Sequence, residues 1–304
     1  MELAITLATQ VFMMFLLAGF GYVCYRKQWI NQEGSRQISS LLLNGVTPIL
    51  IILSYQMEFD MKKLQTLCLT VVISAISFGI SILVSQLLFQ KDGVELVFAS
   101  VFSNASFFAV PIVEATLGNE ALLYLTAYLA CFNVMVWTYG YSLMKQDSIR
   151  VSWKQLVTNP GVSGVLIGLL LFICSVKLPP VIQTAMRNIA NLNTPLAMLV
   201  FGIFFAQIEF KSIFEHRRIW LVSFVRLLVL PGCILAILFF VPSSYHTMKL
   251  TLVIASSAPV AITTALFAQK HERDYQLATK SIGHSSLFSI VTIPMLILLA
   301  NQLW

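Results

Sequence analysis

The sequence predicts an all-α integral membrane protein with ten transmembrane helices, built as a five-plus-five inverted repeat whose fourth and ninth helices are broken at prolines and cross. Three observations predict this class. Hydrophobic residues make up 58% and charged residues 11% of the 304 residues, against about 25% charged in an average soluble protein. Ten apolar blocks follow one another with short connections, and short motifs of the first half recur 147 or 148 residues later.

The apolar blocks match the length of a membrane-crossing helix, which is about 17 to 25 residues. In chain order they cover residues 3–24, 38–54, 64–89, 94–117, 121–144, 156–176, 181–208, 219–241, 250–268 and 277–299. These blocks leave little chain for a soluble domain. We therefore expect the lipid bilayer to surround most of the protein.

The charges indicate orientation in the membrane and not a nucleic-acid partner. There are 19 Lys and Arg against 13 Asp and Glu, a net charge of +6, and the basic residues lie mostly between apolar blocks. With the N-terminus outside, 13 of them fall in inner connections and five in outer ones. We expect a multi-pass protein of the cell (inner) membrane with both termini outside.

Residue patterns typical of metal sites, cofactor sites and enzymes are missing from the sequence. The five cysteines lie in apolar blocks without a CxxC pair, as small buried hydrophobic residues do. The nearest approach to an HExxH zinc motif is His271-Glu272, which lacks the second histidine. We expect no metal, no cofactor and no enzymatic activity.

An odd number of spans in each half requires the halves to enter the membrane in opposite orientations. The repeats are predicted at residues 1–147 and 148–304. Thr47-Pro48 in the second span matches Thr194-Pro195 in the seventh, and Pro111 in the fourth matches Pro259 in the ninth.

Both matched prolines stand in polar, irregular stretches, residues 103–111 and 256–264. A proline inside a helix removes a hydrogen bond and collides with the preceding turn, and irregular backbone at membrane depth is tolerated only where protein or a cavity covers it. Two simple kinks closed by Ser and Thr hydroxyls are the plain alternative. Matched interruptions in inverted halves indicate instead a transport site near the midplane.

The broken helices favour an anion as the ligand. Each break exposes the start of a second half-helix, which carries about half a positive elementary charge, and no pair of membrane carboxylates neutralises it. A small organic anion with a carboxylate is the simplest case. The candidate substrate-binding residues are Asn104, Ser106, Pro111, Pro259, Thr263, Thr264, Thr47 and Thr194.

The residues also resemble the auxin efflux carrier family, which includes plant auxin transporters and bacterial malate and malonate permeases. The resemblance covers nearly the whole chain. It is carried by Asn104 followed by aromatic residues and Pro111-Ile112, by Asn193-Thr194-Pro195-Leu196 through Gly202, and by Ala258-Pro259, Phe267-Ala268 and Ile293-Pro294. It implies a ten-helix inverted repeat in which Asn104, Pro111 and Pro259 form a carboxylate-binding crossover.

Three ionisable residues at membrane depth are candidates for coupling or charge compensation, because a charge there is costly. Glu114 follows Pro111 by three residues, in the expected first turn of the second half-helix, and could offset its positive end or titrate with a proton. Arg226 could form a salt bridge, extend toward the inner face or contact the anion. His284 could titrate near neutral pH or pack as a hydrogen-bonded neutral side chain.

These observations predict a secondary transporter of small organic anions, mono- or dicarboxylates, that works by alternating access around the crossover. A cation/proton antiporter of the same architecture is the alternative, although it would be expected to place carboxylates where this sequence has Asn, Ser and Thr. The sequence leaves open the substrate, the direction of flux, proton or sodium coupling, and whether the chain forms a homodimer.

Overall fold

The computed structural model describes residues 2–146, 158–208 and 210–304. Over these residues the chain is built from helices, and the one β contact is an isolated antiparallel bridge between Ser103 and Val260. The expected repeat boundary at residues 147 and 148 lies outside the described residues.

The helices of the first half follow the predicted apolar blocks. They are α1 (Glu2–Arg26), α2 (Gln32–Leu41), the π-helical turn η1 (Leu42–Val46), α3 (Thr47–Ser54), α4 (Met61–Phe89), α5 (Val94–Val101), α6 (Ala105–Leu117), α7 (Asn119–Met135), the π-helical turn η2 (Val136–Gly140) and α8 (Tyr141–Lys145).

The helices of the second half do the same. They are α10 (Pro160–Ile173), α11 (Pro180–Ala190), α12 (Asn193–Ala206), the 3-10 turn η3 (Phe210–Phe214), α13 (Arg217–Phe224), the π-helical turn η4 (Val225–Val229), α14 (Leu230–Phe239), the 3-10 turn η5 (Ser243–Tyr245), α15 (His246–Ser257), α16 (Thr263–Lys270) and α17 (Tyr275–Leu303).

Six helical runs among the described residues are long and apolar enough to cross a membrane: Gln32–Ser54, Met61–Phe89, Glu120–Lys145, Pro180–Ala206, Arg217–Phe239 and Tyr275–Leu303. Shorter apolar helices such as α6 and α10 accompany them. The count of ten spans stays a prediction.

Polar side chains at the connections fix where several helices begin. Asn31 accepts a hydrogen bond from the Gly34 amide at 2.8 Å, and Asp60 accepts one from Lys62 at 2.9 Å. Asn159 accepts from two amides at the start of α10, where a proline occupies the first helical position. Such caps satisfy amides that have no partner within the helix, so the sequence sets the helix ends even where the chain is apolar on both sides.

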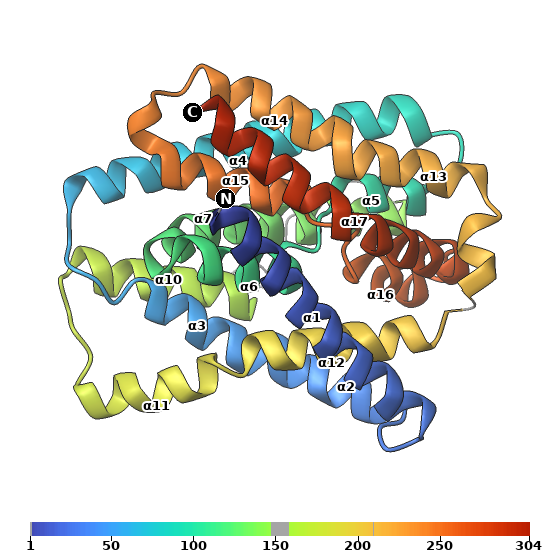
Figure 1. Cartoon of the computed structure of the whole chain (residues 1–304), viewed down its shortest axis with the longest axis horizontal. Coiled ribbons are helices and arrows are strands. Elements are labelled where there is room, and N and C mark those ends of the chain that lie inside the picture. The colour runs from blue at the N-terminus through green and yellow to red at the C-terminus, as the bar shows by residue number, and fades with distance from the viewer. Residues whose placement is uncertain (1, 147–157, 209) are drawn as a thin grey trace.

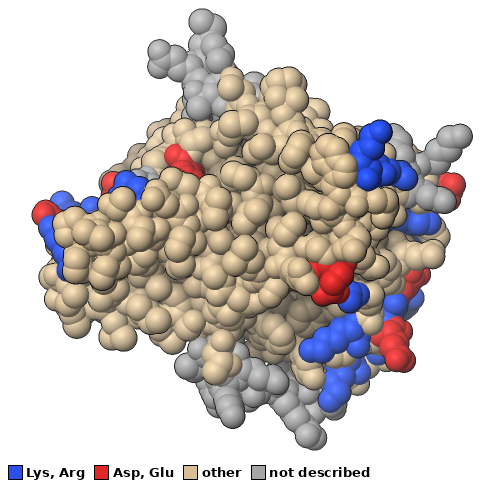
Figure 2. Space-filling model, turned by 90° about the horizontal axis from the view of Figure 1, so that it is seen from below, with Lys and Arg blue, Asp and Glu red and all other residues tan. Residues whose placement is uncertain are grey.

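The helices run mostly along the long axis of the molecule, and their connections gather at its two ends. In Figure 1, α2, α3, α11 and α12 lie along the lower part, and α4, α13, α14 and α17 along the upper part. The α3–α4 and α14–α15 connections lie at the left, and the α1–α2 and α12–α13 connections at the right. In Figure 2 the charged residues gather toward these two ends, with a broad uncharged surface between them, as expected for a protein with an apolar belt in lipid.

Two close helix crossings join the halves. A Cβ on Gly202 in α12 would collide with the backbone oxygen of Ala18 in α1, and one on Gly168 in α10 would lie 2.5 Å from the ring of Tyr55, just past the end of α3. Small residues allow such close approach between membrane helices, where no hydrophobic effect drives association. The first predicted span of each half, represented by α1 and α10, therefore packs against the second span of the other half.

Candidate functional site

The fourth predicted span is broken in the middle, but not at its proline. Helix α5 ends at Val101 and α6 begins at Ala105 after three non-helical residues. Pro111 lies within α6, seven residues beyond Asn104, and its carbonyl oxygen accepts a hydrogen bond from Gln10 at 3.1 Å. The expectation that Pro111 breaks the helix is therefore wrong, because the break lies where the Asn104 backbone amide bonds to another segment.

The ninth span is broken at its proline, as expected. Helix α15 ends at Ser257, Ala258 is extended with φ −61° and ψ 146°, and α16 begins at Thr263. A residue before proline is disfavoured in the helical conformation. Pro259 thus ends α15 and begins the irregular segment.

The two breaks pair with each other. The Asn104 amide donates to the Pro259 carbonyl at 2.7 Å, and the Ala261 amide donates to the Phe102 carbonyl at 3.0 Å. Ser103 and Val260, between these bonds, form the antiparallel bridge. The amide of Asn104 is therefore used between the halves and not within a helix, so this pairing interrupts the fourth span without help from a proline.

Polar side chains of neighbouring helices hold this bridge. The Ser285 hydroxyl accepts a hydrogen bond from the Val260 amide at 3.0 Å, and the hydroxyls of Ser103 and Tyr128 lie 3.0 Å apart. All four side chains are buried. The crossing is thus a fixed, fully covered piece of backbone.

A cavity of about 330 Å³ lies beside the crossing. Among the predicted residues, Thr47, Asn104, Ser106 and Thr263 line it. Aromatic side chains and amides complete the wall, namely Phe107, Phe132, Trp137, Phe267, Asn44, Asn133 and Asn159. Lys270 is the one charged residue among those that line this cavity.

The cavity receives hydrogen-bond donors that the protein leaves unused. The Asn104 amide nitrogen Nδ2 and the Thr263 hydroxyl are buried without a partner among the described residues. Ala105 and Ser106 are the first residues of α6, and Thr263 is the first of α16, so their backbone amides have no partner within their helices. Buried unpaired donors are costly, which makes this a place for an acceptor.

Four predicted residues do not line the cavity. Pro111 lies inside α6, Pro259 ends α15, and Thr264 is fully buried on another side of α16 with its hydroxyl unpaired. Thr194 stands next to Asn193, whose Oδ1 accepts a hydrogen bond from the Thr47 hydroxyl at 3.2 Å. That bond joins the second and seventh spans beside the cavity.

Arg226 reaches the crossing at the ends of α5 and α15, and not at the helix starts that line the cavity. It lies on the π-helical turn η4 and is 2% exposed. Its guanidinium donates to the carbonyls of Ser100 at 3.1 Å and Val101 at 3.0 Å, and to that of Ser256. No acidic side chain of the described residues pairs with it, so it neither forms the expected salt bridge nor extends to the inner face.

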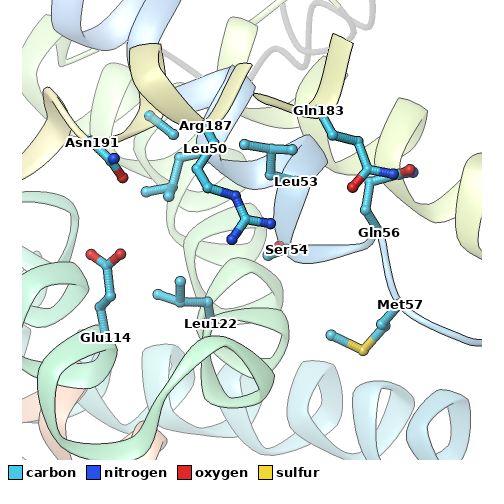
Figure 3. Close-up of a pocket in the computed structure, with 11 residues that line it drawn as sticks. Leu50, Leu53, Ser54, Gln56, Met57, Glu114, Leu122, Gln183, Arg187 and Asn191 are labelled. Atoms are coloured by element: carbon cyan, nitrogen blue, oxygen red, sulfur yellow. The ribbon is translucent and has the colours of Figure 1, made fainter. Parts of the chain in front are cut away.

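Glu114 lies in a second, smaller cavity of about 230 Å³. Because α6 begins at Ala105, Glu114 is near the end of that helix and not in its first turn. Its carboxylate and the guanidinium of Arg187 on α11 both point into this cavity, which Gln56 and Gln183 also line (Figure 3). Gln56 and Gln183 adjoin connections expected outside, whereas Lys270 adjoins one expected inside, so the predicted topology would put the two cavities on opposite sides of the crossing.

His284 is a packed side chain. It is 1% exposed, its Nδ1 lies 2.7 Å from the Ser223 hydroxyl, and the rings of Trp220 and Phe288 are centred 4.5 and 4.7 Å from its own. It lines neither cavity. The geometry gives it no contact with the crossing.

Positive charge gathers at the mouth of the larger cavity. Lys270 ends α16, with Nζ 5.9 Å from the ring centre of Trp137, and His271 follows it. Burial, together with the positive charges of Lys270, Arg273 and Lys145, lowers the pKa of His271. Lys270, the one charged residue among the described residues that line this cavity, favours an anion over a cation there.

The sequence left several cavity residues without a role. Asn133 stands in the middle of an apolar block, where an amide at membrane depth is itself a signal. In the sequence, Lys270 is one of the basic residues between apolar blocks, and nothing in its neighbourhood indicates that it faces the crossing. The sequence around Arg187 is likewise that of an ordinary surface helix, and only the structure places α11 opposite α6.

Comparison with known proteins identifies the type of chain. A family described as "Membrane transport protein" matches residues 6–152 and 146–297, nearly the whole sequence in two segments. No protein in the comparison with curated proteins matches the chain.

Proposed function

We propose a function from one premise: the chain belongs to the membrane transport protein family, the auxin efflux carrier family that its residues resemble. On that premise the protein is a secondary transporter of small organic anions, mono- or dicarboxylates. The anion binds at the crossing of the fourth and ninth spans, in the larger cavity.

The observation that carries the proposal is the set of unused donors around the crossing. The side-chain amide of Asn104 and the Thr263 hydroxyl are unpaired among the described residues, Ser106 and Thr263 stand in the first turns of α6 and α16, and all three residues line one cavity whose lining contains no carboxylate. Helix N-termini with free amides are ready-made anion sites. A carboxylate would satisfy several of these donors at once, and charge-assisted hydrogen bonds are about twice as strong as neutral ones.

The cavity walls suit the rest of an organic acid. Phe107, Phe132, Trp137 and Phe267 provide apolar surface around the polar centre, which is the usual composition of a small-molecule site. A volume of about 330 Å³ leaves room for a small acid with its first water molecules. The proposal does not distinguish a monocarboxylate from a dicarboxylate.

The movement that we propose is alternating access between two groups of helices. One group contains α1–α3 and α10–α12, the other α4–α8 and α13–α17, and each cavity is lined by residues of both groups. Rocking of one group against the other would open the crossing to the two sides in turn. Helix α1 of the first half packs on α12 of the second half, and α10 of the second half packs on α3 of the first. This reciprocal packing supports two inverted repeats.

A cation/proton antiporter of the same architecture would need an acceptor for its cation. The larger cavity offers only amides, hydroxyls and Lys270 as polar side chains, and Arg226 holds the crossing from behind. No cluster of His, Cys, Asp and Glu suited to a metal ion occurs among the described residues. These features favour the anion.

The test is counterflow in proteoliposomes loaded with unlabelled organic acids, against a panel of labelled mono- and dicarboxylates. We expect at least one acid to be exchanged by the wild-type protein. Asn104→Asp, which places a fixed carboxylate at the start of α6, should abolish the exchange without unfolding the protein. Sodium or lithium movement driven by a pH gradient, with no exchange of any acid, would refute the proposal.

A further inference from the structure

Arg226 contacts the ends of the first half-helices of both broken spans, α5 and α15, a role that the sequence pattern does not indicate. The carbonyls that accept its hydrogen bonds belong to the last residues of α5, Ser100 and Val101, and to Ser256 at the end of α15. The last four carbonyls of a helix have no partner within it. One side chain therefore satisfies the free carbonyls of two helices that are distant in sequence.

The charges at the crossing show what this arrangement does. Four helix ends meet there: the starts of α6 and α16, each about +0.5 elementary charge, and the ends of α5 and α15, each about −0.5. Without another charge these contributions cancel, and the crossing does not favour anions over cations. The guanidinium of Arg226 offsets the two negative ends, so a net charge of about +1 is left.

The burial of Arg226 requires such a role. A fully buried guanidinium without a carboxylate partner is costly, and Arg226 is 2% exposed with its Nε unpaired. It also lies on a π-helical turn, a distortion that often occurs at functional sites because it turns one side chain out of the regular helical register. The carbonyl ends of helices are the partners that remain for this guanidinium, and they carry a partial negative charge.

We propose that Arg226 is a positioning residue that fixes the crossing and gives the adjoining cavity its preference for anions. It does not touch the substrate, because its donors point to the ends of α5 and α15 and it does not line the cavity. This inference rests on the proposed function for the identity of the ligand, but the fixing of the crossing does not depend on it.

The expected effect on affinity follows from distance. The guanidinium binds the end of α5, and the proposed ligand binds the start of α6. The three residues between these two helices span about 10 Å. At an effective dielectric constant of about 20, a unit charge at that separation changes affinity by about tenfold. Arg226→Gln should therefore raise the half-saturation concentration for the transported acid about tenfold, and Arg226→Lys, which keeps the charge, by no more than about threefold.

The first measurement is hydrogen–deuterium exchange of the purified protein without substrate. Peptides that cover residues 100–104 and 256–261 should exchange faster in Arg226→Lys, because an ammonium cannot span three carbonyls as a guanidinium does, and faster again in Arg226→Gln. The matched control is Lys249→Gln. Lys249 is another buried cation, on α15, but it donates to Val241 and lies over the ring of Trp304, so its loss should leave both crossing segments unchanged.

The outcomes separate the two proposals. Unchanged exchange at both segments in Arg226→Lys overturns the inference, even if Arg226→Gln fails to fold. Equal affinity for the acid in wild type and Arg226→Gln overturns the part that concerns charge. If the wild-type protein moves no organic acid while both segments exchange faster in the variants, the proposed function fails and Arg226 still fixes the crossing.

Discussion

Replacing Asn104 with alanine should reduce anion transport strongly and leave the fold intact. Asn104 is 6% exposed at the start of α6, and its side chain caps no backbone amide. Its Nδ2 has no partner among the described residues. An amide that served only the fold would have a partner, so its removal would be felt as lost stability.

The expected changes in affinity and in stability follow from the unpaired state of the Asn104 side chain. A hydrogen bond to a charged group contributes about 1.5–3 kcal/mol, which corresponds to a rise of about ten- to a hundredfold in the half-saturation concentration. The folded protein loses no side-chain hydrogen bond, and an unpaired buried donor is itself unfavourable by about 1–3 kcal/mol. The melting temperature of Asn104→Ala should therefore equal or exceed that of the wild type.

The assay pairs initial uptake rates in proteoliposomes with thermal unfolding in detergent. Asn188→Ala is the matched control, because Asn188 is an exposed amide on α11 and should change neither quantity. Wild-type uptake by Asn104→Ala at normal expression would refute the reasoning. So would a loss of uptake that merely follows a fall in melting temperature.

Four further predictions follow from the same geometry. Thr263→Val should lower uptake and Thr264→Val should not, because only the first hydroxyl faces the cavity; equal kinetics in the two variants would contradict this. Lys270→Gln should raise the half-saturation concentration by about three- to tenfold at low salt and less at high salt, since charge at an open mouth is screened over about 8 Å; an effect independent of salt would count against it. A cysteine introduced in residues 145–155 should react with an impermeant maleimide from the cytoplasmic side alone, and labelling from outside would reverse the proposed topology. An imposed membrane potential should drive accumulation of the acid, with Glu114→Gln retaining most of it; strict dependence on a proton gradient that is lost in this variant would make Glu114 a coupling residue.

The sequence predicted the interrupted helices because the signal is local. A run of Ser, Asn and Pro inside an apolar block is unusual wherever it occurs, and Pro259 ends α15 through a steric effect on its own neighbour. The helix starts at Asp60 and Asn159 also depend on local contacts, because each side chain accepts from an amide two or three residues further on.

The position of the first break could not be found in the same way. The amide of Asn104 bonds to the carbonyl of Pro259, 155 residues away, and a local pattern contains no record of such a partner. The proline of that span was the most visible residue, so it was assigned the break, and Glu114 was misplaced with it. The partners of Arg226 are backbone carbonyls up to 126 residues away, which no side-chain pattern can indicate.

Which side chains of a helix face the cavity could also be seen only in the structure. Thr263 and Thr264 are adjacent and chemically alike, and which of them faces the cavity depends on where α16 begins. Lys270 joins the cavity for the same reason, since it lies two turns along that helix from Thr263. Sequence patterns of this kind therefore indicate which residue types lie near the crossing, but not which of their side chains face the cavity.

The central claim is that an organic anion binds at the crossing and not in the cavity that holds Arg187. Protection from alkylation tests this directly, in a protein whose five native cysteines have been replaced. With the transported acid at saturating concentration, a cysteine at Ser106 should react several times more slowly, and a cysteine at Gln183 should react at an unchanged rate. Protection at Gln183 with none at Ser106 would contradict the account.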